Sequence, residues 1–482
     1  MSAVITNNQL LGTENSLADV MEKLSSGFSI NHASDDPSGI AIAGKMQAQI
    51  EGLAKASNNG SDGISVLQTA EGALNEVTDM IQRMRELSVQ AANGTNSVSE
   101  RQTIQKEIDS LLEEIDRVAE TTEFNNINLL KGSLDNRTYA AHASRIQKSN
   151  TAPAGIYALK ITSAAVQAKI STNTASSNTI TQEINNSFYN TKTTTSVTTP
   201  SYTSFKDFID NTTWTETVVN TSTGETTSTQ DGTGLGLSGT ISINGYGITL
   251  TQGTSGEGVY EMLRDACELA GAEISSPSDG SGYSINSIKY GADANLKVEF
   301  SSVAFANALG FMIGQTDEDA EPVLTNVGVD AKIQLEFNDG TNESMFKSTA
   351  TYNTDGNHIT ISDVGGFEMS FLAEADYEED TANNIDGKIY FNVTDIGSMT
   401  LHIGANKNQN MEVRIAAVTT QFMYIDDLDV TRVDGPEDAM TSLDEALSYV
   451  TSVRSQLGAY ENRLEHTTKS LDATEENMTS AI

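Results

Sequence analysis

The side chains of this sequence that could take part in chemistry are mainly carboxylates in short clusters. Asp35 and Asp36 are adjacent, and residues 317–319 and 378–380 are two acidic triplets. Paired carboxylates can serve as acid and base, and clusters can bind calcium. Asp35 and Asp36, however, precede Pro37, a pattern typical of a helix start, where a carboxylate favours the helix dipole. The triplets lack the glycine and ligand spacing of an EF-hand loop, so we interpret them as solvated acidic loops and predict no metal site.

The other reactive side chains form no recognisable catalytic pattern. The five histidines are scattered, without the H-E-x-x-H spacing of a zinc protease. The single cysteine, Cys267, excludes a disulfide within the chain, and its helical spacing from Val259 and Leu263 predicts a small buried side chain. Residues 234–239 match G-x-G-x-x-G, but they follow a threonine-rich tract and precede a hairpin signal, so we interpret them as a turn. We predict no enzyme and no cofactor.

Apolar stripes predict long helices at both ends of the chain. Over residues 62–91 apolar side chains recur at steps of three and four, and after Asn93-Gly94 a second helix is expected, with Ser99 and Gln102 as its capping box. Over residues 443–478 an apolar side chain recurs every seven residues. The side chains assigned to the bundle seam are Ile64, Leu67, Leu74, Ile81, Met84, Ile104, Ile108, Leu111, Ile115, Leu443, Val450, Leu457, Leu464, Leu471 and Met478.

The middle of the chain has β-structure signals. Residues 155–162 alternate like a strand, and Asn244-Gly245 separates two short apolar runs, as in a hairpin. The tract 171–233 is rich in Thr, Ser and Asn, and we expect it to be a polar surface segment or partly disordered. These patterns predict a multidomain α+β chain, in which a long antiparallel α-helical bundle or coiled coil from both chain ends carries a β-rich central insertion.

The charge balance restricts the partners. The 482 residues include 66 acidic and 28 basic side chains, a net charge of −38. Such a surface repels nucleic acid phosphates and anionic membranes, so we expect neither as a partner. No apolar run is long enough to span a bilayer.

Both ends of the sequence resemble bacterial flagellin. The similar stretches are LSSGFSIN at 24–31, EGALNEVTDMIQRMRELSVQAANGTN at 71–96, TTEFNNINLL at 121–130, IGAN at 403–406, and the final helix over 455–482. The resemblance implies four parts. They are an N-terminal helix of a terminal coiled coil (1–37) with its partner largely missing, an N-terminal helical core (38–133), a variable β-rich insertion (134–396) with a small module at about 237–310, and a C-terminal core (397–482) with a β-hairpin and long helix. Relative to the family, the chain is short at both termini.

The resemblance also implies a function. A flagellin is a secreted, non-enzymatic subunit that polymerises into the extracellular flagellar filament for motility, with the export apparatus, chaperone and cap proteins as further partners. Polar side chains such as Arg83, Arg85, Arg454 and Glu461 are then expected to be available between subunits. Two alternatives stay open. One is a hook–filament junction protein, and the other is a surface-displayed binding module that acts through the central insertion.

One short segment carries a further implication of the resemblance. In flagellins the segment matching residues 82–87 also contacts Toll-like receptor 5, a vertebrate innate receptor. Gln82, Arg83, Leu87 and, on the next helix, Glu107 match positions implicated in that contact. An exposed arginine beside apolar residues is a common hot spot of protein interfaces. The receptor is therefore a candidate partner.

Overall fold

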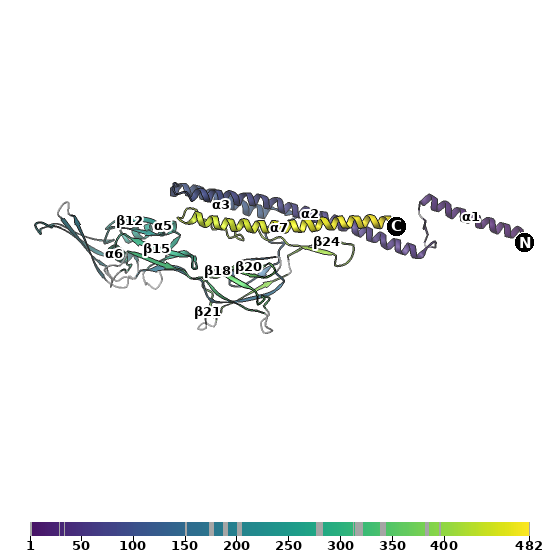
Figure 1. Cartoon of the computed structure of the whole chain (residues 1–482). Helices are drawn as coiled ribbons and strands as arrows, with labels where there is room; N and C mark the ends of the chain where they lie inside the picture. Colours follow the sequence, from purple (N-terminus) through teal and green to yellow (C-terminus); the bar gives the residue numbers. More distant parts are fainter. Residues whose placement is uncertain are drawn as a thin grey trace.

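The computed structural model describes residues 2–481 except for short gaps at 28, 33, 150–151, 173–177, 187–190, 200–204, 276–282, 312, 314–321, 338–343, 381–384 and 395–396. A bundle of long helices forms one side of the molecule (Figure 1). A β-domain lies beside the bundle, and an outer α+β module lies at the end where helices α2 and α3 meet. The predicted α+β class, with helices from both chain ends and a β-rich centre, is confirmed.

The long helices come from the two ends of the chain, as the apolar stripes predict. The turn before α2 confirms the predicted helix start. The Asp36 carboxylate accepts hydrogen bonds from the backbone N–H groups of Ser38 and Gly39 at 3.0 and 2.9 Å, and Pro37 occupies the first helical position. These bonds, that of Gly39 first, lower the pKa of Asp36. The helices are α1 (Ser2–Ser26), α2 (Pro37–Ala91), α3 (Val98–Thr121) and α7 (Gly435–Ala481).

The cap of α3 differs from the prediction. Ser97, not Ser99, is the N-cap, and Glu100, not Gln102, completes the capping box. The Glu100 carboxylate accepts the Ser97 backbone N–H at 2.7 Å, while the Ser97 hydroxyl accepts the Glu100 backbone N–H at 3.4 Å. The carboxylate also favours the positive end of the helix dipole, an advantage that the neutral Gln102 does not have.

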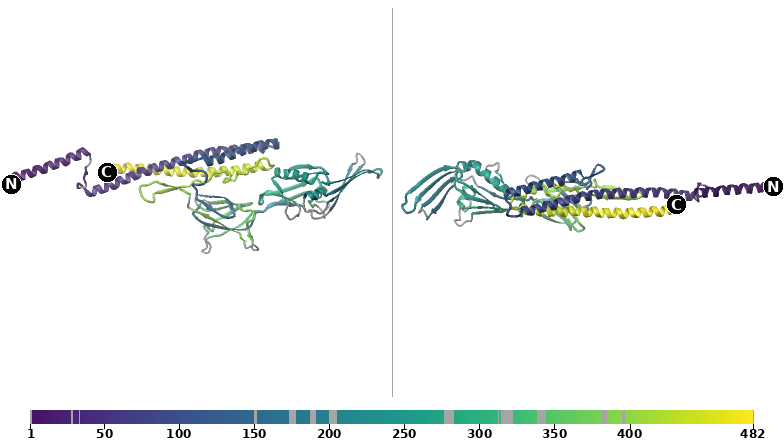
Figure 2. Two further views of the ribbon diagram at one scale, coloured as in Figure 1. Left: turned by 180° about the vertical axis from the view of Figure 1, so that it is seen from behind. Right: turned by 90° about the horizontal axis from the view of Figure 1, so that it is seen from above.

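The bundle core is built by α2 and α7, which run antiparallel, with α3 folded back along α2 (Figure 2). Most of the assigned seam is buried in one cluster, including Leu74, Ile81 and Leu457. Leu111 is only half-buried, because Leu112 takes the inward position at that turn. The other half-buried seam residues are Ile64, Leu471 and Met478.

The β-domain packs two four-stranded antiparallel sheets against each other. Tyr157, Leu159, Phe371 and Phe391 are among its fully buried core residues. The sheets are β17 (Lys332–Leu335), β5 (Gly155–Ser163), β23 (Lys388–Val393) and β3 (Thr138–Tyr139), and β18 (Thr351–Asp355), β19 (His358–Asp363), β20 (Phe367–Ala373) and β4 (Ala143–Lys148). Two-stranded hairpins are β1 (Glu123–Phe124) with β2 (Ile127–Asn128), β21 (Glu379–Asp380) with β22 (Ile385–Asp386), and β24 (Met399–His402) with β25 (Asn410–Val413).

The outer module has its own core, with members from Ala168 to Ile313. Its predicted hairpin is confirmed, since Asn244 and Gly245 both have positive φ and Ile243 pairs with Tyr246. Its helices are α4 (Phe205–Asp210), α5 (Gly256–Leu269) and α6 (Val303–Ala308). Two of its sheets are β12 (Tyr246–Leu250), β11 (Gly239–Ile243), β15 (Asn295–Phe300) and β16 (Val323–Val327), and β13 (Ala272–Ser275), β14 (Ser284–Tyr290) and β6 (Gln167–Ser171).

The described part of the threonine-rich tract is ordered, which the composition did not predict. It contributes a four-stranded antiparallel sheet in the order β10-β9-β8-β7. Threonine is β-branched and favours extended backbone, so the strands form although Ile180 and Val197 are the two side chains that they add to the core. The same tract also buries Phe205, Phe208 and Ile209 of α4. The strands are β7 (Asn178–Asn186), β8 (Thr191–Thr199), β9 (Thr213–Asn220) and β10 (Thr226–Thr233).

Candidate functional site

The outward face of the α2–α3 hairpin carries most of the predicted contact residues. Gln82 and Arg83 are exposed on α2, and Arg83 reaches across to α3. Its guanidinium donates to the Glu107 carboxylate at 2.7 and 3.1 Å and to Glu86 at 3.3 Å, which raises the pKa of Arg83. About half of each side chain in the Arg83–Glu107 pair stays exposed, so the pair is accessible to a partner.

Leu87 does not lie on that face. It is 2% exposed and belongs to the bundle core, so it supports the surface from inside. An apolar side chain that α2 does expose near Gln82 is Val89, which is 50% exposed. Val89 falls outside the three- and four-residue spacing of the buried apolar stripe of α2. This spacing is the sequence signal that the Val89 side chain points outward.

The polar rows expected between subunits form contacts within this chain. Arg85 donates to Asp444 of α7 at 2.6 and 3.2 Å, and Gln68 donates to Glu461 at 2.8 Å. Arg454 lies 3.7 Å from the Glu71 carboxylate. Arg85, Arg454 and Glu461 therefore have partners within the chain, because α2 and α7 face each other with these side chains opposed, and their availability to neighbouring subunits stays a prediction.

The Arg85–Asp444 pair predicts a pH-dependent stability. The hydrogen bonds from Arg85 lower the pKa of Asp444 below its ordinary 3.8. A carboxyl with a lowered folded pKa stabilises the fold above its unfolded pKa and loses that contribution as the pH falls through the folded one. We expect Asp444→Asn to lower the melting temperature at pH 7 and to have no effect below the folded pKa. Thermal melts followed by circular dichroism between pH 2 and 7 measure the melting temperatures of both proteins. An equal difference in melting temperature at every pH would contradict the stabilising role of the Arg85–Asp444 pair.

Helix α1 presents a long apolar stripe with nothing packed on it. Leu10, Leu17 and Leu24 follow at seven-residue steps with Met21 beside them, and the large apolar side chains of α1 are between 50% and 80% exposed. The helix projects past the end of α7 (Figure 1), and a 2.8 Å contact joins His32 to Glu22. Exposed apolar stripes of this length mark association surfaces.

The other predicted chemistry has these outcomes. Cys267 is buried, as predicted, and burial raises its pKa to about 12. The 234–239 segment leads into strand β11 rather than a helix. In the 378–380 triplet, Glu378 accepts the Ala164 backbone N–H at 2.8 Å and Glu379 lies 2.7 Å from Lys160, so these carboxylates hold the fold and are not simply solvated.

The described residues contain no cluster of metal ligands and no helix suited to span a membrane. The 317–319 triplet lies outside these residues, and within them no three His, Cys, Asp or Glu side chains gather closely enough to hold a metal ion. None of the described helices has the length and apolarity needed to cross a membrane.

Comparison with known proteins identifies the long helices at the two ends. Residues 1–135 match the family model of the bacterial flagellin N-terminal helical region, and residues 440–482 match that of the C-terminal helical region. Both ends of the chain thus resemble the helical regions of bacterial flagellin. Over 133 residues the chain is 51% identical to Flagellin B of Vibrio anguillarum. The aligned stretch covers 28% of this chain and 34% of that flagellin. Over 135 residues it is 52% identical to Phase 1 flagellin of Salmonella naestved, with coverage of 28% and 26%.

The matched stretch thus spans about a third or less of those flagellins. Solved structures were also compared. FliC from Burkholderia pseudomallei aligns with 16% identity and a TM-score of 0.23, covering 83% of this chain and 99% of its own. The flagellar junction protein FlgL from Legionella pneumophila aligns with 12% identity and a TM-score of 0.28, covering 93% and 100%.

Proposed function

We propose that this chain is a structural subunit that polymerises into a bacterial flagellar filament for motility. The observation that carries the proposal is the unpacked apolar stripe of α1, which lies within the region that matches the flagellin N-terminal family. Burying such a stripe against another copy removes apolar surface from water, which is the main favourable term in protein association.

The geometry favours growth over closure. The stripe of α1 lies at one end of the molecule, and the turn between α2 and α3 lies at the far end of the bundle (Figure 2), so packing of α1 on that far end of another copy would join unlike surfaces. Heterologous contacts of this kind produce open helical assemblies unless the rotation between copies closes a ring. The bundle of α2, α3 and α7 then serves as the rigid body of the subunit.

The flagellin match of both ends supports further parts of the proposal. The subunit is non-enzymatic, is exported through the flagellar apparatus with chaperone and cap proteins as partners, and works outside the cell. Residues 1–37, 38–133 and 397–482 form the assembling core, and residues 134–396 form the projecting insertion.

Electron microscopy and sedimentation velocity of the purified chain test the proposal. Because the net charge is −38, copies repel one another at low ionic strength, and added salt should favour assembly. We expect long filaments with a concentration threshold in salt and monomers without it. Small closed oligomers would instead favour the junction-protein alternative, and monomers under all conditions would reject self-assembly.

We also propose that Toll-like receptor 5 is a partner, through the exposed Arg83–Glu107 pair with Gln82 beside it. We expect Arg83→Ala to weaken binding of the receptor ectodomain by about tenfold or more, the usual range for an interface hot spot. Surface plasmon resonance measures the affinity. Arg117→Ala is the matched control, because Arg117 is an exposed arginine of α3 paired with Glu114 within its own helix. Equal losses for both variants, or none for Arg83→Ala, would reject this contact.

A further inference from the structure

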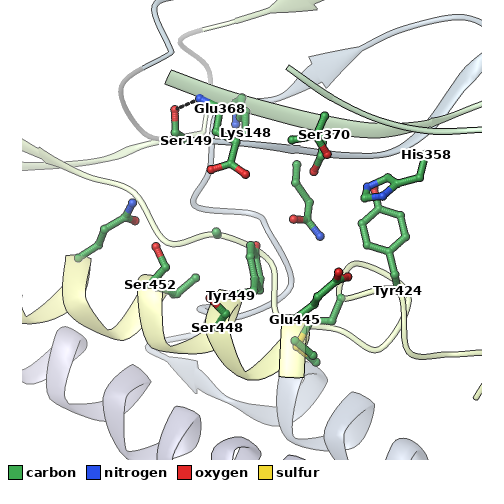
Figure 3. Close-up of a pocket in the computed structure, with 17 residues that line it drawn as sticks. Lys148, Ser149, His358, Glu368, Ser370, Tyr424, Glu445, Ser448, Tyr449 and Ser452 are labelled. Atoms are coloured by element: carbon green, nitrogen blue, oxygen red, sulfur yellow. Dashed lines mark hydrogen bonds between the residues drawn. The ribbon is translucent and has the colours of Figure 1, made fainter. Parts of the chain in front are cut away.

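A cleft of 440 Å³ lies between α7 and the β-domain (Figure 3). One wall is the α7 surface with Glu445, Ser448 and Ser452, and the opposite wall includes Glu368 and Ser370 of strand β20 in the β-domain. This volume is in the range of small-molecule sites. Of the two walls, the flagellin family match covers only the one on α7.

The charges in the cleft do not balance. Glu368 and Glu445 both line it, and within the described residues neither carboxylate takes part in an ion pair. Burial raises the pKa of Glu445, with a smaller contribution from Asp355, as expected for a carboxylate that faces no cation.

The cationic side chain that lines the cleft is already neutralised. Lys148 lies 2.9 Å from Asp135, and both side chains of this pair are nearly buried. His358 adds no positive charge near neutral pH, because burial lowers its pKa from the ordinary 6.5. The cleft therefore has an excess of negative charge with one carboxylate on each wall.

The neutral groups of the cleft include hydroxyl and amide groups, whose oxygens can accept hydrogen bonds, and aromatic rings. The Tyr449 hydroxyl donates to the Ala417 carbonyl at 2.9 Å, which leaves its oxygen able to accept. The Tyr424 hydroxyl likewise donates to the Arg145 carbonyl. Aromatic faces attract organic cations, and carboxylates and hydroxyl oxygens accept hydrogen bonds from ammonium groups.

We propose that this cleft binds a primary alkylammonium ligand, with Glu368 and Glu445 pairing with its cationic ends. Because the carboxylates stand on opposite walls, a ligand with an ammonium group at each end can pair with both. Two kinds of molecule carry such an ammonium group, a free alkyl diamine and the side chain of a lysine. The site is independent of filament assembly, since it lies beside the bundle and away from α1.

Isothermal titration calorimetry of the full chain at monomeric concentration tests the site. The probes are 1,5-diaminopentane for the free diamine and Nα-acetyl-lysine amide for the lysine side chain, at constant ionic strength. We expect saturable one-to-one binding of the diamine, at least fivefold tighter than the lysine amide. Equal affinities would keep the ammonium site but assign it to lysine side chains, and no saturable binding of either probe would overturn it.

Three variants and a matched control separate the site from general attraction to an acidic protein. We expect Glu445→Gln and Glu368→Gln each to weaken diamine binding about fivefold or more, and Ser448→Phe to block it by filling the cleft without changing the charge. Glu476→Gln removes the same charge from an exposed position near the end of α7 and should leave affinity unchanged. An equal loss in Glu476→Gln, or equal displacement by magnesium chloride at the same ionic strength, would overturn the proposal.

Discussion

Placing aspartate at Leu10 and Leu17 should abolish filament assembly at protein concentrations where the unmodified chain assembles. Each leucine is more than half exposed in the single chain, and its burial between copies contributes roughly 1.5–3 kcal/mol. Losing two such contacts costs about 3–6 kcal/mol per subunit, which raises the assembly threshold on the order of a hundredfold to ten-thousandfold. Sedimentation and electron microscopy across a concentration series in salt measure this threshold.

The matched control adds the same charge to the other face of α1. Asn8→Asp with Asn15→Asp also introduces two negative charges, but at exposed polar positions away from the stripe of Leu10 and Leu17. We expect this variant to assemble with a threshold within a few-fold of the unmodified chain. If both double variants failed alike, repulsion would explain the loss and the apolar stripe would not. If both assembled, α1 would not be the association surface.

The local features of the helices were predictable because neighbouring residues determine them. The Asp36-Pro37 start of α2 needs only an acceptor and a fixed φ in adjacent positions, and the sequence displays both. The seam of α2 and α7 follows from periodicity alone, and Ile81 and Leu457 are buried as that period requires. The cap of α3 was harder, since Ser97 and Ser99 each precede an acceptor by three residues, and the structure selects the pair with the charged partner, Glu100.

The pairing between segments far apart in the chain was not predictable. Arg85 donates to Asp444 and Gln68 donates to Glu461 because α2 and α7 pack in one particular register. No local sequence pattern specifies that register. Composition was less informative at the threonine-rich tract, where low apolar content left open a polar surface segment or partial disorder. Strand formation there depends on backbone pairing with β-branched residues, and this needs few buried side chains.

The cleft beside α7 was also not predictable, because it is formed by segments far apart in the chain. Glu368 and Glu445 lie far apart in the sequence, and neither belongs to a recognisable motif. They face one space only because the β-domain folds back beside the bundle (Figure 3). Acidic clusters that are contiguous can be recognised in the sequence, whereas the placement of Glu368 and Glu445 at one cleft depends on the fold.

Truncating the seam should have the largest effect on stability. Leu457→Ala removes a side chain that is 1% exposed and packed in the main core cluster, and we expect it to lower the free energy of unfolding by about 2–5 kcal/mol. The loss has two parts, the transfer free energy of the deleted methyl and methylene groups and the cavity left between the two long helices. Urea unfolding followed by circular dichroism at 222 nm measures the change.

Leu24→Ala is the matched control, because the same substitution is made in a helix where the side chain is 80% exposed. No packing is lost there, so the change should stay within about 0.5 kcal/mol. A loss below 1 kcal/mol in Leu457→Ala would mean that α2 and α7 are not packed together in the free chain. The pair of variants also separates two roles of leucine in this molecule. Leu457 stabilises the single copy, whereas the leucines of α1 have no contact to lose until a second copy covers them.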